Sequence, residues 1–121
     1  MFINEKSEKY RAINKRLIDV CDAKEKKILN TTIRVNGLSF VKLRDILIEI
    51  GKIHLEDIEA NIYIAVIPGG FARMNYAVVA FQLLEDELII AAYANEGIIN
   101  QHTSEGVVDE FRKYIGQYIE T

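Results

Sequence analysis

Residues 61–97 read NIYIAVIPGGFARMNYAVVAFQLLEDELIIAAYANEG and contain three runs rich in isoleucine, valine, tyrosine, phenylalanine and alanine. Residues of these types fit the pleated surface of a β-sheet. The runs cover residues 61–67, 76–84 and 87–95, and turn-forming residues separate them. Links as short as these place consecutive strands side by side. The stretch therefore predicts a three-stranded antiparallel meander.

The first link of this meander holds the only proline of the chain, Pro68, followed by Gly69 and Gly70. Proline cannot donate to a strand ladder, and glycine permits backbone angles closed to other residues, so a wide turn is expected. Phosphate-binding loops lead into a helix, whereas this loop leads into an apolar strand, which disfavours nucleotide binding. Arg73 has the geometry to hold a carboxylate or phosphate, although a lone loop arginine is more often solvated or paired with an acid.

Apolar residues at helical spacing predict three amphipathic helices around the meander. They cover residues 5–29, a segment from 40 or 42 to 50, and a segment from about 104 to 119. Ser39 is a candidate N-cap of the second helix, and Gly51 is its candidate stop. These helices are expected to carry their charged residues towards solvent.

Two connecting segments complete the predicted order of elements. β-Branched residues at 31–35 precede Asn36 and Gly37, a pair that favours a tight turn and predicts a short hairpin. Residues 52–60 read KIHLEDIEA and are interpreted as a polar connector with a helical turn over 55–60. The predicted order is α-ββ-α-βββ-α, an α+β fold in one domain of 121 residues.

This element order is similar to that of the small profilin-like and roadblock-like regulatory domains. Those domains typically pair as dimers and serve as platforms for GTPases or scaffolds. The resemblance is one of topology, and it implies a homodimeric regulatory module.

Both faces of the predicted strands are apolar, which is unusual for an antiparallel sheet in a small domain. Two apolar faces require cover on both sides, either from helices of the same chain or from another subunit. Small residues predict close approach of whatever covers them, and they form the candidate interface: Ala65, Ala80, Ala92 and Ala94. The sequence leaves both sources of cover open.

Composition and charge argue against binding to nucleic acid and against insertion into a membrane, and they indicate a compartment. The net charge is -3 at pH 7, so a surface that neutralises several nucleic-acid phosphates is not expected. No apolar run approaches the roughly 20 residues that span a bilayer, so no membrane insertion is expected. The lone Cys21 and the absence of a secretory signal pattern predict a cytoplasmic protein.

Catalytic constellations are not evident in the sequence. His54 and His102 lie in polar connectors without the spacing of a zinc site, and no strained nucleophile motif occurs. We therefore assign no catalytic residue, metal or cofactor.

The leading prediction is a non-enzymatic cytoplasmic protein-interaction or regulatory module that acts as a homodimer and binds another protein. An adaptor, a regulatory subunit and an immunity-type protein all fit this description. The alternative is a small-ligand-binding protein or enzyme with its site near Pro68–Asn75. The residues of that site would be Gly69, Gly70, Arg73, Asn75 and Tyr93.

Overall fold

The computed structural model describes residues 5–69, 75–95 and 102–120. In these ranges the helices are α1 (Glu5–Cys21), α2 (Phe40–Ile50) and α3 (Thr103–Tyr114), with short 3-10 turns η1 (Glu25–Lys27) and η3 (Gly116–Tyr118). Five strands form one sheet: β1 (Leu29–Arg34), β2 (Lys52–Asp57), β3 (Ile62–Gly69), β4 (Asn75–Leu83) and β5 (Glu87–Tyr93). The α+β class is confirmed.

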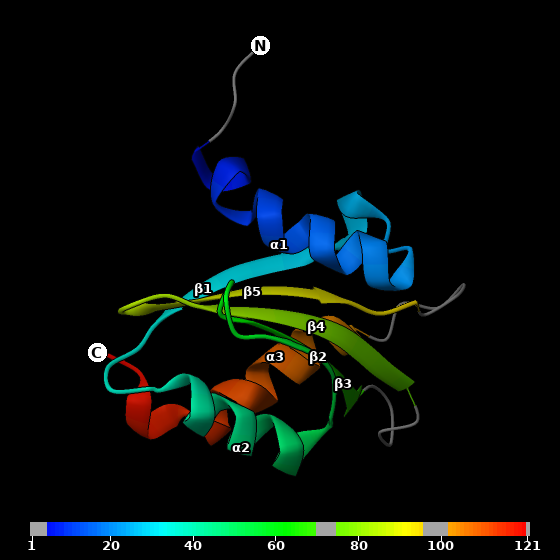
Figure 1. The fold of residues 1–121 in the computed structure, drawn as a ribbon. Helices are drawn as coiled ribbons and strands as arrows, with labels where there is room; N and C mark the ends of the chain where they lie inside the picture. Colours follow the sequence, from blue (N-terminus) through cyan, green and yellow to red (C-terminus); the bar gives the residue numbers. More distant parts are fainter. Residues whose placement is uncertain (1–4, 70–74, 96–101, 121) are drawn as a thin grey trace.

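The sheet is antiparallel throughout, with strand order β1-β5-β4-β3-β2. The strands β3, β4 and β5 are the meander expected from the sequence. Helix α1 covers one face of the sheet, while α2 and α3 lie on the other face (Figure 1). The fold therefore has three layers, with the sheet in the middle.

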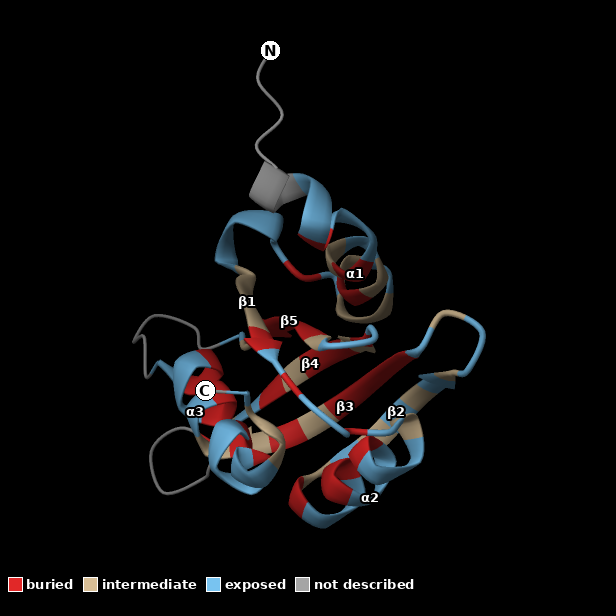
Figure 2. Ribbon diagram, turned by 90° about the vertical axis from the view of Figure 1, so that its left-hand side faces the viewer, coloured by how far each residue is buried: buried red, intermediate tan, exposed pale blue. Residues whose placement is uncertain are grey.

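Two apolar clusters fill the spaces between these layers, and most residues of the central strands are buried (Figure 2). The cluster on the α1 side includes Tyr10, Ile13, Leu17, Ile62, Ile64, Ala80, Ile89, Ala91 and Tyr93. The cluster on the other side includes Leu43, Leu47, Tyr63, Ala65, Val79, Phe81, Ile90, Ala92, Val107 and Phe111. The helices of this chain thus cover both faces of its own sheet, which explains why the strands are apolar on both sides.

Helix α1 is also tied to the edge strand β1 by polar contacts. The Tyr10 and Thr32 hydroxyl groups are 2.8 Å apart. The Asn14 side-chain amide donates to Asn30 at 3.0 Å, and the Asn30 amide donates back at 2.7 Å. Positions four apart on a helix and two apart on a strand each lie on one face, so the two pairs fix the register of α1 on β1.

The prediction of a hairpin around Asn36 and Gly37 is wrong. Gly37 has the positive φ of 76° that the pair favours. However, Ser39 already caps α2, because its side chain accepts from the Lys42 backbone N–H at 3.0 Å. The helix therefore begins before a return strand has room to form. Val35 instead forms an isolated antiparallel bridge with Ile119.

The polar connector expected over residues 52–60 is also wrong, because its first part is the edge strand β2. The register shifts between Ile53 and Leu55, which pair with Ala65 and Ile64 and leave His54 as the extra residue of a β-bulge. The bulge turns Ile53 towards the α2 side and Leu55 towards the α1 side. At this edge of the sheet, β2 thus contributes one apolar side chain to each of the two clusters.

Both terminal helices are shorter than expected. Helix α1 ends at Cys21 because Asp22 has a left-handed φ of 56°, and the segment that follows leads into η1 and β1. Helix α3 ends at Tyr114, and Gly116 begins η3. In the second helix, the expected N-cap Ser39 and the expected stop Gly51 are confirmed.

Candidate functional site

The ligand hypothesis names five residues, of which Gly70 and Arg73 lie outside the described residues. Gly69 ends β3 beside α3. A Cβ atom at Gly69 would lie 2.6 Å from Cγ2 of Val107 on α3. Glycine at this position therefore allows β3 and α3 to pack closely.

The other two ligand candidates lie on different sides of the sheet. Asn75 pairs with Gly69 and donates its amide to the Thr103 hydroxyl at 3.2 Å. Its side-chain oxygen accepts from the Tyr76 backbone N–H at 2.9 Å. Tyr93 packs in the cluster beneath α1, on the opposite face. The structure does not bring Asn75 and Tyr93 together, and the ligand hypothesis stays a prediction.

The four alanines of the candidate interface lie within or against the two core clusters. Ala65 and Ala92 are fully buried on the side of α2 and α3, and Ala94 is partly buried against the same cluster. Ala80 is fully buried beneath α1. Helices of the same chain cover these small residues. This is the first of the two sources of cover that the sequence left open.

Titratable groups are scattered rather than gathered into a site. No group of three or more metal-ligating side chains occurs among the described residues. His102 lies 3.8 Å from the Glu105 carboxylate at the start of α3, and His54 is exposed at the β2 bulge. Burial raises the pKa of the Cys21 thiol, which donates to the Leu17 carbonyl at 3.3 Å. A thiol in such surroundings is a weak nucleophile at neutral pH.

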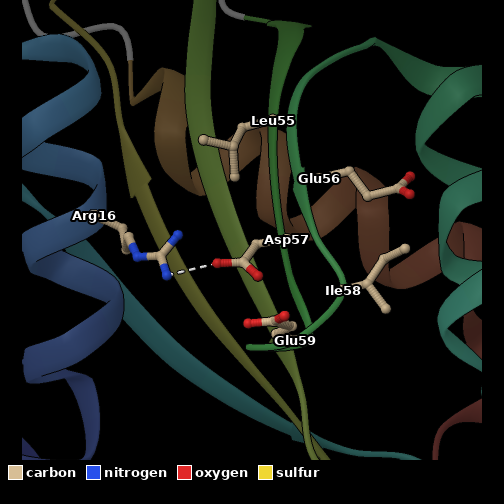
Figure 3. A pocket seen from close by; sticks show the side chains of 6 residues that line it. All are labelled: Arg16, Leu55, Glu56, Asp57, Ile58 and Glu59. Carbon is tan, nitrogen blue, oxygen red and sulfur yellow. Dashed lines mark hydrogen bonds and ion pairs between the residues drawn. The ribbon is translucent and has the colours of Figure 1, made fainter.

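A hollow of about 420 Å³ lies between α1 and the turn that follows β2 (Figure 3). Two of its charged groups bind each other, because the Arg16 guanidinium donates to Asp57 Oδ2 at 2.7 Å. This contact holds the pKa of the Asp57 carboxyl below its usual range. Asp57 Oδ1 accepts from the Ala60 backbone N–H at 3.1 Å. The arginine therefore ties α1 to β2, and Asp57 also shapes the turn.

Helix α2 is anchored on the other side of the sheet. The Tyr63 hydroxyl donates to the Phe40 carbonyl at 3.1 Å, and the two rings stack with centroids 4.1 Å apart. The Arg44 Nε donates to the Glu56 carboxylate on β2 at 3.1 Å. The residues that α2 buries are Leu43, Ile46, Leu47 and Ile50. These contacts fix which side of α2 faces outwards.

The outward side of α2 carries aliphatic side chains that no element of the described chain covers. Val41 is 67% exposed and Ile48 is 52% exposed. Seven residues apart on a helix, they lie on one face. We call the exposed residues on this side the α2 surface: Val41, Lys42, Asp45, Ile48 and Glu49. Outside the α2 surface, Ile58 in the turn after β2 is also 67% exposed, and it lies on the side towards α2 (Figure 3).

The stability of the protein at high pH tests the contact of Tyr63 that anchors α2. Burial raises the pKa of Tyr63 from 10.0 to about 12. The unfolded chain loses this proton first, so the contribution to stability is complete below pH 10.0 and is lost as the pH rises towards about 12. Tyr63→Phe should reduce this loss of stability at high pH. At neutral pH it should lower the free energy of unfolding by about 0.5–1.5 kcal/mol, because the hydrogen bond is lost.

Urea unfolding across this pH range, together with tyrosinate absorbance, measures both effects. The wild type should show a tyrosine ionisation step near pH 12, and this step should be missing in Tyr63→Phe. An unchanged titration curve in the variant would contradict the assignment of the late step to Tyr63.

Comparisons with protein-family models, with curated proteins and with solved structures gave no match. The topological resemblance to profilin-like and roadblock-like domains stays a prediction. No described helix is both long enough and apolar enough to cross a membrane. The α2 surface is thus identified from the geometry of this chain alone.

Proposed function

We propose that this chain is a non-enzymatic cytoplasmic protein-interaction module, and that it binds its partner through the α2 surface. The observation that carries the proposal is the exposure of Val41 and Ile48 on one face of a helix whose other face is fully packed. A single exposed aliphatic residue is ordinary, but two on one helix face form an unpartnered apolar stripe.

The surroundings of the stripe fit a protein partner. Lys42, Asp45 and Glu49 give the α2 surface a polar rim of both signs, and a protein interface typically combines an apolar centre with such a rim. The helix is held rigidly by the Tyr63 and Arg44 contacts, so its surface is preorganised and little conformational entropy is lost on binding. The cytoplasmic assignment rests on the single unpaired cysteine, which is typical of a reducing compartment.

Site-specific photo-crosslinking tests this function in the organism that encodes the chain. A benzophenone amino acid at position 41 or 48 should give a discrete adduct, and crosslinked peptides should identify one defined contact segment for both positions. Both positions are exposed, so the probe should leave the fold intact.

The matched control carries the same probe at Asp109, an exposed position of α3. It should give no such adduct. If positions 41 and 48 yield only the background seen at position 109, the α2 surface is not a binding surface and the proposal is wrong.

A further inference from the structure

We infer that the α2 surface binds a second copy of this chain, with the two α2 helices packed antiparallel across a two-fold axis. This inference rests on the proposed function and names its partner. The self-complementary pattern of apolar and charged residues along α2 carries it. A two-fold interface uses the same patch on both subunits, so the patch must fit itself.

The apolar residues satisfy this requirement. In an antiparallel pair centred between Arg44 and Asp45, each residue lies level with the one at the same distance on the other side of the centre. Val41 is then level with Ile48 of the second copy, and Ile48 is level with Val41 of the second copy. Two aliphatic contacts, about 10 Å apart along the axis at ~1.5 Å per residue, would cover the side chains that are exposed in one chain.

The charged rim satisfies the same requirement on one flank of the stripe. Lys42, Asp45 and Glu49 lie on this flank, away from the side on which Arg44 meets β2. In the antiparallel pair, Lys42 falls between Asp45 and Glu49 of the second copy, about 3 Å along the axis from each. Asp45 of each chain also approaches Asp45 of the second copy at the centre of this flank, and the two lysines, each facing two carboxylates of the other chain, offset that like-charge approach. Charge complementarity of this kind fixes the register of an interface.

The opposite flank does not oppose the pairing. Arg44 of each chain approaches the same residue of the second copy there, but each guanidinium already binds the Glu56 carboxylate of its own chain at 3.1 Å. The two like charges are therefore partly neutralised before the chains meet. The β2 edge is a poor site for the same partner, because its bulge interrupts the ladder that an added strand would need.

One helix face is a small interface, below about 1,200 Å² in total, so the dissociation constant should lie in the micromolar range. The mass-average molar mass should rise from the 13.8 kDa of one chain towards twice that value as the concentration increases. Light scattering or sedimentation from about 5 to about 500 µM covers the expected transition.

Aspartate substitutions test the apolar contacts. Val41→Asp or Ile48→Asp should weaken association by at least about tenfold, because each places a charge in the apolar centre of the interface. Leu84→Asp is the matched control, since Leu84 is 41% exposed in the turn between β4 and β5. It should associate like the wild type. Circular dichroism confirms that each variant is folded.

A charge exchange tests the register and the identity of the partner. Lys42→Glu alone, and Asp45→Lys with Glu49→Lys in one chain, should each suppress self-association because like charges then face one another. A mixture of the two variants should form heterodimers with near wild-type affinity, because opposite charges face again at both ends. Glutamate near the start of α2 and lysine near its end also suit the helix dipole, so neither variant should weaken the helix.

The outcomes separate this inference from the proposed function. A strict monomer at all concentrations, a dimer that persists in both aspartate variants, or a mixture that stays monomeric would each overturn the inference. In any of these cases, a defined crosslinked segment from another protein at positions 41 and 48 would still support the proposed function. Concentration-dependent dimers with recovery in the mixture would support both.

Discussion

Phe81→Ala should lower the free energy of unfolding by about 3–5 kcal/mol, because it removes a large buried ring and leaves a cavity. Phe81 is 1% exposed in β4 and lies level with Tyr63 and Ile90 on the neighbouring strands. Its ring centroid is 4.8 Å from that of Phe111 on α3. The substitution thus loosens the helix from the sheet as well as emptying the core.

Equilibrium urea unfolding measures this effect. Leu84→Ala, three residues further along, is the control, and its stability should stay within about 0.5 kcal/mol of the wild type because Leu84 is exposed. If Phe81→Ala were as mild as this control, Phe81 would not be at the centre of the packing between β4 and α3.

Gly51→Ala should also destabilise strongly, by about 1–3 kcal/mol or more. A Cβ atom at Gly51 would lie 2.5 Å from the Val66 carbonyl oxygen and 3.0 Å from Cγ1 of Ile67. The carbonyl belongs to the backbone of β3, and Val66 pairs with Lys52, the next residue after the glycine. Neither side can yield without disturbing the pairing of β2 with β3.

Gly106→Ala is the matched control for this substitution. Gly106 lies in α3, and a Cβ atom there would have nothing within 4 Å. Alanine should therefore stabilise the chain by about 0.5–1 kcal/mol through helix propensity. Thermal unfolding of the two variants should shift in opposite directions, and a similar small shift for both would rule out the overlap at Gly51.

Local signals in the sequence predicted much of the fold. The strands β3, β4 and β5 are continuous apolar runs between turn residues, and Ser39 and Gly51 mark the ends of α2 by their own chemistry. The edge strand β2 differs from the sequence prediction, because its many polar residues are typical of a connector. Its alternation of Lys52, Ile53, His54, Leu55 and Glu56 was the available signal.

Pairing between residues far apart in the chain could not be predicted from the sequence. Asn36 and Gly37 do form a tight bend, yet only the folded chain shows that Val35 pairs with Ile119. The candidate interface alanines were also ambiguous, since small buried residues fit a helix of the same chain as well as a second subunit. The α2 surface does have a signal in the sequence, because Val41 and Ile48 are out of phase with the buried positions of the same helix.

The position of β1 sets the order in which the chain can fold during its synthesis. Among the described strands, β1 pairs with β5 alone, and α1 packs on β4 and β5. Translation delivers α1 and β1 before β5, and at ~5–20 residues per second β5 follows β1 about 3–12 s later. Until then the apolar side of α1, including Ile13 and Leu17, has no sheet to cover. Helix α1 and β1 are thus made before β5 but reach their final places only after it, and for those seconds the apolar side of α1 is a surface of the kind that chaperones bind.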